Sequence, residues 1–345
     1  MKTVLFCQNP YAFGILEPIM QVLKEKKFKY LWFVRELVID KFPFTDEPVT
    51  SNMQDIIAFK SDAIYVPGNE VPHYLRGLKV QIFHGLAGEK KGHFRIRHYF
   101  DLYLTPGPFF TERFFELKNK YKDFDVIETG WSKLDVYGKD LHKYDAYKKN
   151  LLEKYNAKKI VLYAPTFSPS LTSLPFLIEE FNELSKNKEY LILFKLHDLT
   201  DLNLIGQYEN LAKSTSNIIF EEDKNIIKYL LMADIMVSDT SSVVYEFLLL
   251  DKPVVTFKSN SGNIQWDNSL EYNNLSNRIK TNLEEDNFKL QRANIVKEYH
   301  PYNDGNSSLR MVEVVSNYIE ENGVPENRKL SLLRRLKINK IFGKM

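Results

Sequence analysis

Short apolar runs alternate with amphipathic segments along the whole chain. In its first half, β-branched and aromatic runs predict strands at residues 3–7, 29–34, 63–66, 80–84, 102–105 and 125–128. Several of these runs are apolar at nearly every position. That pattern is typical of parallel strands that helices cover on both faces.

The second half repeats the same alternation. It predicts strands at 159–164, 190–196, 217–221, 234–238 and 253–257, and helices at 174–185, 202–213, 224–231 and 242–250. At 345 residues the chain is long enough for two domains of roughly 150 residues each. We therefore predict an α/β protein with two doubly wound, Rossmann-like domains facing a cleft.

The polar, lysine-rich stretch 138–158 is the expected boundary between the domains. We accordingly predict an N-terminal domain at 1–150, a C-terminal domain at 151–325 and a tail at 326–345. In such folds ligands bind beyond the carboxyl ends of the strands, so candidate chemistry is sought there.

Composition limits the class of protein. The sequence is 44% hydrophobic and 27% charged, which is typical of a soluble globular chain. A net charge of +2 lacks the basic field of nucleic-acid binders, so no nucleic-acid partner is expected. Cys7 alone permits no internal disulfide, and neither a signal-peptide core nor a membrane-length apolar run is found. A cytoplasmic location is expected.

From Arg328 to Met345 the tail is basic without a single acid. Its cations alternate with apolar residues, as in a basic amphipathic helix on an anionic membrane, where each cation contributes about 1 kcal/mol. The alternative is a frayed, solvated tail. The first interpretation predicts peripheral attachment to the inner face of the cell membrane. The cations are Arg328, Lys329, Arg334, Arg335, Lys337, Lys340 and Lys344.

A polar turn joins the predicted strand 234–238 to the following helix. It consists of Ser238, Asp239, Thr240, Ser241 and Ser242. Helix N-termini carry unpaired N–H groups and partial positive charge, so this turn predicts a phosphate site. The alternative is that these residues only cap the helix. Glu246, about one turn into the helix, would bond sugar hydroxyls or face solvent.

Two histidines are each predicted to end a strand, one per domain. His84 lies in QIFHGLAGEKKG and His197 closes YLILFKLH. A neutral imidazole such as His84 suits a general base acting on a hydroxyl. Gly85 follows it, and Lys90 and Lys91 would face a phosphate or be simply solvated.

The remaining histidines lack such a placement and are expected at the surface or in packing. They are His73, His93, His98, His142 and His300. No HExxH or Cys/His cluster predicts a metal site. The absence of GxxxxGK[ST], GxGxxG and GxSxG motifs argues against P-loop kinases, dehydrogenases and common hydrolases. Gly14 would give a flexible point above the first strand where an acceptor approaches.

Six short motifs occur in order from about residue 80 to 310. They are HG at 84, TGWSKLD at 129–135, YAPTF at 163–167, KLHD at 195–198, SDTSSVVYEF at 238–247 and DGNSSLR at 304–310. This ordered set resembles the CDP-glycerol glycerophosphotransferase family, cytoplasmic enzymes that prime or polymerise teichoic acids and related envelope polymers. The first 80 residues match only in general character.

The resemblance implies a GT-B fold in which the second domain holds the nucleotide. It implies that His84 deprotonates the acceptor, His197 contacts the pyrophosphate, and Ser241 and Ser242 hold phosphate oxygens. The wider donor set that it implies is Ser238, Asp239 as support of the turn, Thr240, Lys195 and Glu246 on the ribose. The auxiliary, acceptor-side set is Gly14, Gly85, Lys90, Lys91, Lys133 and Thr166.

Three motifs depart from the family pattern. The loop HGLAGEKKG replaces HGTxxK, the turn DTSS replaces DYSS, and GWSK, with Lys133, replaces GYPR. These changes concern the acceptor first and the donor alcohol second. The two histidines and the serine turn are unaffected.

The function implied is transfer of glycerol phosphate from CDP-glycerol to a hydroxyl of a polysaccharide or lipid-linked saccharide acceptor, releasing CMP without a cofactor. A GT-B transferase that moves Kdo or an N-acetylhexosamine from a sugar nucleotide is the alternative. A non-catalytic polymer-binding protein on the same fold is a third. The sequence leaves open the acceptor, priming or polymerisation, and glycerol or ribitol as the alcohol.

Overall fold

The computed structural model describes residues 1–86, 92–223 and 225–343. The chain forms two compact units, which are described separately. The described residues of the first unit are 1–85, 92–139 and 298–343. Those of the second are residue 86, 140–223 and 225–297.

The first unit is built on a parallel sheet of seven strands in the order β3-β2-β1-β4-β5-β6-β7. The strand order reverses between β1 and β4, where Val4 lies opposite both Leu31 and Ile64. The strands are β1 (Lys2–Cys7), β2 (Lys29–Val34), β3 (Val49–Thr50), β4 (Ala63–Val66), β5 (Leu78–Gln81), β6 (Leu102–Thr105) and β7 (Asp125–Glu128).

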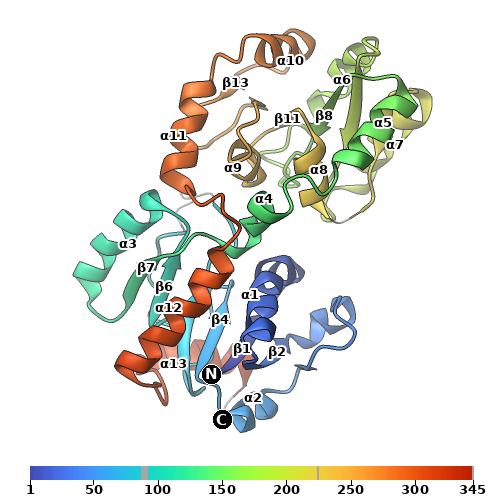
Figure 1. Ribbon diagram of the computed structural model, residues 1–345. Helices are drawn as coiled ribbons and strands as arrows, with labels where there is room; N and C mark the ends of the chain where they lie inside the picture. Colours follow the sequence, from blue (N-terminus) through green and yellow to red (C-terminus); the bar gives the residue numbers. More distant parts are fainter. Residues whose placement is uncertain (87–91, 224, 344–345) are drawn as a thin grey trace. The chain divides into compact units, whose positions relative to one another are not determined.

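Helices cover both faces of this sheet. They are α1 (Phe13–Glu25), α2 (Met53–Phe59), α3 (Pro108–Tyr121), α4 (Val136–Lys139), α12 (Ser307–Asn322) and α13 (Leu332–Phe342). Figure 1 shows α12, from the C-terminal end of the chain, beside α1 from the N-terminal end. One core cluster joins Phe6 of β1 to Ile56 of α2, Phe114 of α3 and Ile338 of α13.

The second unit has a parallel sheet of six strands in the order β10-β9-β8-β11-β12-β13. Here the order reverses between β8 and β11. The strands are β8 (Lys159–Tyr163), β9 (Tyr190–Phe194), β10 (Ile218–Phe220), β11 (Ile235–Ser238), β12 (Val254–Phe257) and β13 (Asp267–Ser269). Because ligands bind at such reversal points in open α/β sheets, the ends of β8 and β11 are where a site is sought.

The helices of the second unit follow the same plan. They are α5 (Asp145–Tyr155), α6 (Ile178–Leu184), α7 (Leu202–Ser214), α8 (Ile226–Met232), α9 (Val243–Leu248) and α10 (Leu275–Glu284), with α11 (Lys289–Tyr299) ending where the chain returns to the first unit. Figure 1 shows β8 and β11 among the helices of this unit. Val161, Phe194 and Val237 meet Phe181 and Leu275 in its core.

The predicted α/β, doubly wound fold class is confirmed by the two parallel sheets. Two short edge strands were missed, because β3 has two residues and β13 reads Asp-Asn-Ser, too short and polar for an apolar pattern. The observed second unit differs from the predicted second domain, 151–325. Residues from Glu298 onward belong to the first unit, since α12 packs on α1.

The C-terminal tail forms helix α13, and the predicted alternative of a frayed, solvated tail is wrong for its described residues. Ile338 is fully buried, and the Phe342 ring lies 5.6 Å from that of Phe6. The opposite side of the helix exposes Leu332, Leu333 and Leu336, at 71%, 80% and 52%. The helix is therefore amphipathic, with one apolar side in the core and a second apolar group at the surface.

Candidate active site

The two residues at the end of β11 hold neighbouring loops in place. Ser238 is fully buried, and its hydroxyl donates to the Ala164 carbonyl at 2.7 Å. The Asp239 carboxylate, also fully buried, accepts from the Thr166 N–H at 2.8 Å. It further accepts from the N–H and hydroxyl of Ser173 at 2.8 and 2.9 Å. These contacts fix the loop after β8 against the end of β11.

Burial raises the pKa of Asp239 to about 6, against the lowering effect of the hydrogen bonds from Thr166 and Ser173. An acid with this pKa is mostly ionised at neutral pH while it holds the loop. The groups that donate hydrogen bonds to its carboxylate belong to Thr166 and Ser173. The Asp239 carboxylate is thus bonded to protein groups of the loop after β8.

The rest of the polar turn is partly exposed. Thr240, Ser241 and Ser242 precede α9, which begins at Val243 and has six residues, fewer than the nine predicted. Ser242 makes no side-chain capping hydrogen bond, which argues against the alternative that it merely caps the helix. The Thr240 hydroxyl accepts from the Asn260 N–H at 3.0 Å and so joins the turn to the loop after β12.

Two predicted donor-side residues are buried. Glu246 in α9 is 4% exposed, so the alternative that it faces solvent is wrong. Lys195 follows β9 and is 8% exposed, and its ammonium donates to the Leu196 carbonyl at 2.9 Å. Lys195 thus lies beneath the surface of the candidate site.

His197 lies in the loop after β9, three residues beyond the strand end at Phe194, rather than closing the strand. Its Nδ1 accepts a hydrogen bond from the Leu199 N–H at 3.1 Å. Partial burial lowers the pKa of His197, against the raising effect of the Asp198 charge and with the help of the Lys195 charge, so the imidazole is mostly neutral at pH 7. Since Nδ1 is the acceptor, the proton sits on Nε2, which is therefore a donor. The Phe167 ring lies 4.4 Å from the imidazole.

His84 of the first unit has the opposite tautomer. It lies three residues after β5 ends at Gln81, because Phe83 takes a left-handed conformation with φ of 60° and ends the strand early. Its Nδ1 is 3.0 Å from the Pro67 carbonyl oxygen. A carbonyl can only accept, so Nδ1 carries the proton, and in the neutral ring Nε2 is the basic nitrogen.

The auxiliary residues are scattered through the first and second units. Gly14 lies inside the first turn of α1, so the predicted flexible point is wrong. Gly85 follows His84, while Lys90 and Lys91 lie outside the described residues. The Lys133 ammonium lies 5.4 Å from the Trp131 ring, and Thr166 contributes its N–H to Asp239.

Histidines predicted to lie at the surface or in packing do so where the structure describes their contacts. His300 is buried, with a pKa lowered to about 4 by burial, and accepts from the Trp131 N–H at 3.0 Å. His98 and His142 pair with Asp123 and Asp145, at 2.7 and 2.8 Å. Within the described ranges, no group of three His, Cys, Asp or Glu residues could hold a metal ion.

Two of the six motifs join in the first unit, which sequence reasoning missed. Asp135 of TGWSKLD accepts from the N–H groups of Ser307 and Ser308 at 2.7 and 2.9 Å, at the start of α12. Arg310 of DGNSSLR donates to the Thr129 carbonyl at 2.8 Å. Asp135 and Ser307 are 172 residues apart, so nothing local in the sequence indicates that one motif anchors the other.

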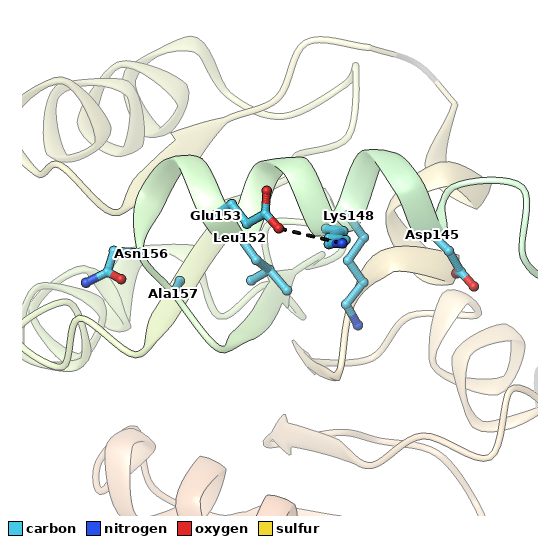
Figure 2. A pocket seen from close by; sticks show the side chains of 7 residues that line it. Asp145, Lys148, Leu152, Glu153, Asn156 and Ala157 are labelled. Atoms are coloured by element: carbon cyan, nitrogen blue, oxygen red, sulfur yellow. Dashed lines mark ion pairs between the residues drawn. The ribbon is translucent and has the colours of Figure 1, made fainter.

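A surface hollow in the second unit contains none of the predicted residues. It is lined by one side of α5 and the two residues that follow it, including Asp145, Lys148, Leu152 and Ala157 (Figure 2). Lys149 and Glu153, one turn apart, form a 3.9 Å ion pair there. A single exposed helix lines the hollow, so it offers no convergent polar groups.

Across the described part of the chain, no helix has the length and apolar character needed to span a membrane.

Residues 78–264, more than half of the chain, match the family described as CDP-glycerol:poly(glycerophosphate) glycerophosphotransferase. The chain belongs to this family. The matched segment of this glycerophosphotransferase family member starts at β5 and contains His84, His197 and the whole serine turn. The resemblance predicted from six motifs is confirmed.

Curated and solved relatives agree with this membership. The chain is 29% identical over 237 residues to the teichoic acid glycerol-phosphate primase of Bacillus subtilis (strain 168), covering 63% of this chain and 58% of that protein. It is 32% identical over 143 residues to the teichoic acid poly(ribitol-phosphate) polymerase of Bacillus spizizenii, covering 39% and 22%. The chain therefore spans just over half the length of the Bacillus subtilis relative.

The fold of this family member is also that of a solved relative. A variant of the wall teichoic acid polymerase TagF, soaked with CDPG, superposes with a TM-score of 0.66 at 18% identity, over 92% of this chain and 89% of that chain. At this identity the likeness concerns the fold alone. The predicted GT-B type is confirmed.

Proposed function

We propose that the protein transfers glycerol phosphate from CDP-glycerol to a hydroxyl of an envelope-polymer acceptor and releases CMP. The observation that carries this proposal is the pair of opposite histidine tautomers within a member of the glycerophosphotransferase family. One imidazole is set to accept a proton and the other to donate a hydrogen bond. Transfer of a phosphoryl group to an alcohol needs one of each.

In the proposed reaction the acceptor oxygen attacks the phosphorus that carries glycerol. The new P–O bond forms as the bond to the CMP oxygen breaks, and the acceptor proton passes to Nε2 of His84. The Pro67 carbonyl supports this role, because it holds Nδ1–H and stabilises the imidazolium that forms. CMP leaves with the electron pair on its phosphate oxygen.

The donor would be held by the second unit. His197 would donate from Nε2 to a pyrophosphate oxygen, Ser241 would add its hydroxyl, and Ser242 would add its hydroxyl and N–H; the Ser241 N–H already donates to the Asp239 carbonyl at 3.0 Å. Ser238 and Asp239 would act as positioning residues, since their side chains bond to the loop after β8. Glu246 would reach the ribose from α9. The buried Lys195 ammonium would attract the negatively charged phosphates of the donor without reaching the surface.

Replacing His197 should weaken donor binding more than turnover. We expect His197→Ala to raise the Kd for CDP-glycerol about tenfold, the usual cost of one hydrogen bond to a charged group. His197→Gln, which keeps an N–H donor, should recover part of the loss. His142→Ala, at an exposed histidine of the same unit, is the matched control. Calorimetry showing equal affinities for all three variants would refute the donor role.

The donor itself is tested by a screen of activated substrates. CMP release should be measured with CDP-glycerol, CDP-ribitol and CMP-Kdo, and UDP release with UDP-sugars. We expect turnover with CDP-glycerol to exceed that with any sugar nucleotide. Preference for a sugar nucleotide would replace the proposal by the glycosyltransferase alternative, and binding of none would favour a non-catalytic protein.

The protein is further proposed to act in the cytoplasm, at the inner face of the membrane, through α13. The exposed group Leu332, Leu333 and Leu336 is accompanied by exposed cations, which supports a peripheral contact with anionic lipid. The cations are Lys329, Arg335, Lys337 and Lys340.

A charge placed in this leucine group should release the protein from lipid. We expect Leu333→Glu to lower binding to phosphatidylglycerol vesicles about tenfold, because one leucine no longer enters the bilayer surface. Leu37→Glu, at a leucine 82% exposed elsewhere in the first unit, should change nothing. Point variants are needed, since deleting the tail would uncover Phe6 and the rest of its core. Equal sedimentation of both variants with vesicles would refute the contact.

A further inference from the structure

The segment after β1 lies outside the family match and borders the proposed base. Residues 1–77 are not part of the matched segment, yet Tyr11 lies in the short 3-10 helix η1 (Pro10–Ala12) directly after β1. The β1 strand pairs with β4, and the residue after β4 is Pro67, which holds His84. Elements from the unmatched part of the chain therefore meet at the imidazole.

Tyr11 contacts His84 with its ring. The ring centroids are 5.4 Å apart and the ring planes differ by 33°. The Asn9 side-chain amide donates to the Tyr11 hydroxyl at 3.3 Å, and Pro10 fixes the backbone just before it. The side chain is nevertheless 46% exposed. A large aromatic ring is thus held beside the base with much of its surface open to solvent.

We propose that Tyr11 is an acceptor-binding residue that stacks against the ring of a cyclic saccharide at the acceptor end. This inference rests on the proposed function, in which His84 takes the acceptor proton. An aromatic face carries negative potential, and the C–H bonds on one face of a sugar ring carry the complementary partial charge. Stacking would bury apolar surface on both and hold a sugar hydroxyl near Nε2 of His84.

The charge around Tyr11 favours a neutral sugar over a polyanionic chain end. After burial and the Cys7 side chain, the Glu70 carboxylate also raises the pKa of Tyr11, so an acid lies near the ring. The Lys337 ammonium is 3.0 Å from Glu70 and offsets part of that charge. A glycerol phosphate chain would bring further negative charge here and offers no flat face. A saccharide terminus fits both observations.

The test compares two acceptors and four proteins. With CDP-glycerol as donor, transfer should be measured to an N-acetylhexosamine disaccharide on a short alkyl chain and to a glycerol phosphate oligomer. We expect Tyr11→Ala to raise KM for the disaccharide about tenfold, with kcat changed less than about twofold. Tyr11→Phe keeps the ring and should behave as the native protein. Tyr121→Ala, at an exposed tyrosine of the same unit, is the control.

Other outcomes would overturn the proposal. A fall in kcat with an unchanged KM, or a shifted pH–rate profile, would mean that Tyr11 only positions His84. Preferential use of the glycerol phosphate oligomer by the native protein would exclude the saccharide class. Calorimetry of the disaccharide with donor-free protein gives an independent readout, because loss of binding in Tyr11→Ala supports the stacking even if CDP-glycerol proves not to be the donor. Equal binding by all four proteins contradicts it.

Discussion

His84→Ala should lower kcat for transfer from CDP-glycerol by about 10² or more and leave the Kd for CDP-glycerol nearly unchanged. The Pro67 carbonyl fixes the tautomer in which Nε2 is basic, and alanine removes that base while every residue of the second unit is unchanged. Pre-steady-state rates and calorimetry on the same samples separate the two effects.

Two controls distinguish a base from a structural residue. His142→Ala should retain full turnover, because that histidine only pairs with Asp145 at the surface. Added imidazole should restore part of the activity of His84→Ala, since a base from solution can enter the space vacated. Loss of CDP-glycerol binding in a folded His84→Ala protein would contradict the assignment.

Asp239→Ala should destabilise the folded protein. It leaves the buried N–H of Ser173 and the partly buried N–H of Thr166 without their acceptor, and the Ser173 hydroxyl loses a partner. We expect the free energy of unfolding at pH 7 to fall by about 2 kcal/mol, and donor affinity to fall as the loop after β8 loosens. Asp140→Ala, at an exposed aspartate, should change neither the free energy of unfolding, measured in urea, nor the affinity for CDP-glycerol, measured by calorimetry. Equal stability of both variants would refute the clamp.

The raised pKa of Asp239 also predicts a pH dependence. In the folded protein the pKa of Asp239 is about 6, so the protonated acid is favoured, whereas the pKa of an aspartate in the unfolded chain is about 3.9. The extra stability that protonated Asp239 provides, about 3 kcal/mol in total, is therefore fully present below about pH 4 and is lost as the pH rises through 6, whereas the hydrogen bonds from Thr166 and Ser173 remain. Asp239→Asn has no such titration. The stability difference between native protein and Asp239→Asn should shrink over this range, and a constant difference would contradict the prediction.

Much of the fold could be predicted because its strands are apolar and buried. The run Tyr190–Phe194 reads as a strand, since core packing and β propensity favour the same structure there. Where tertiary contacts decide, the sequence pattern misleads. The amphipathic pattern of Ser307–Asn322 predicts a helix but does not indicate that it packs on α1. That packing depends on hydrogen bonds to Asp135, which lies far away in the chain.

The residues of the candidate site could be proposed from the sequence, but the protonation pattern of its histidines could not. The serine turn, His84 and His197 could be found from their positions near strand ends. Their tautomers could not, because these depend on the Pro67 carbonyl and the Leu199 N–H, whose positions only the folded loops determine. Tyr11 was missed for the same reason. An aromatic residue in a polar segment carries no signal until it is seen against the imidazole.

The most direct test of the central claim is the mass of the acceptor after reaction. The protein should be incubated with CDP-glycerol and a synthetic saccharide acceptor, and both the acceptor mass and the CMP formed should be measured. We expect the acceptor to gain whole glycerol phosphate units, one for each CMP released, and His84→Ala to form neither product at a comparable rate. CMP release without a change in acceptor mass, or a mass gain only from a sugar nucleotide, would contradict it.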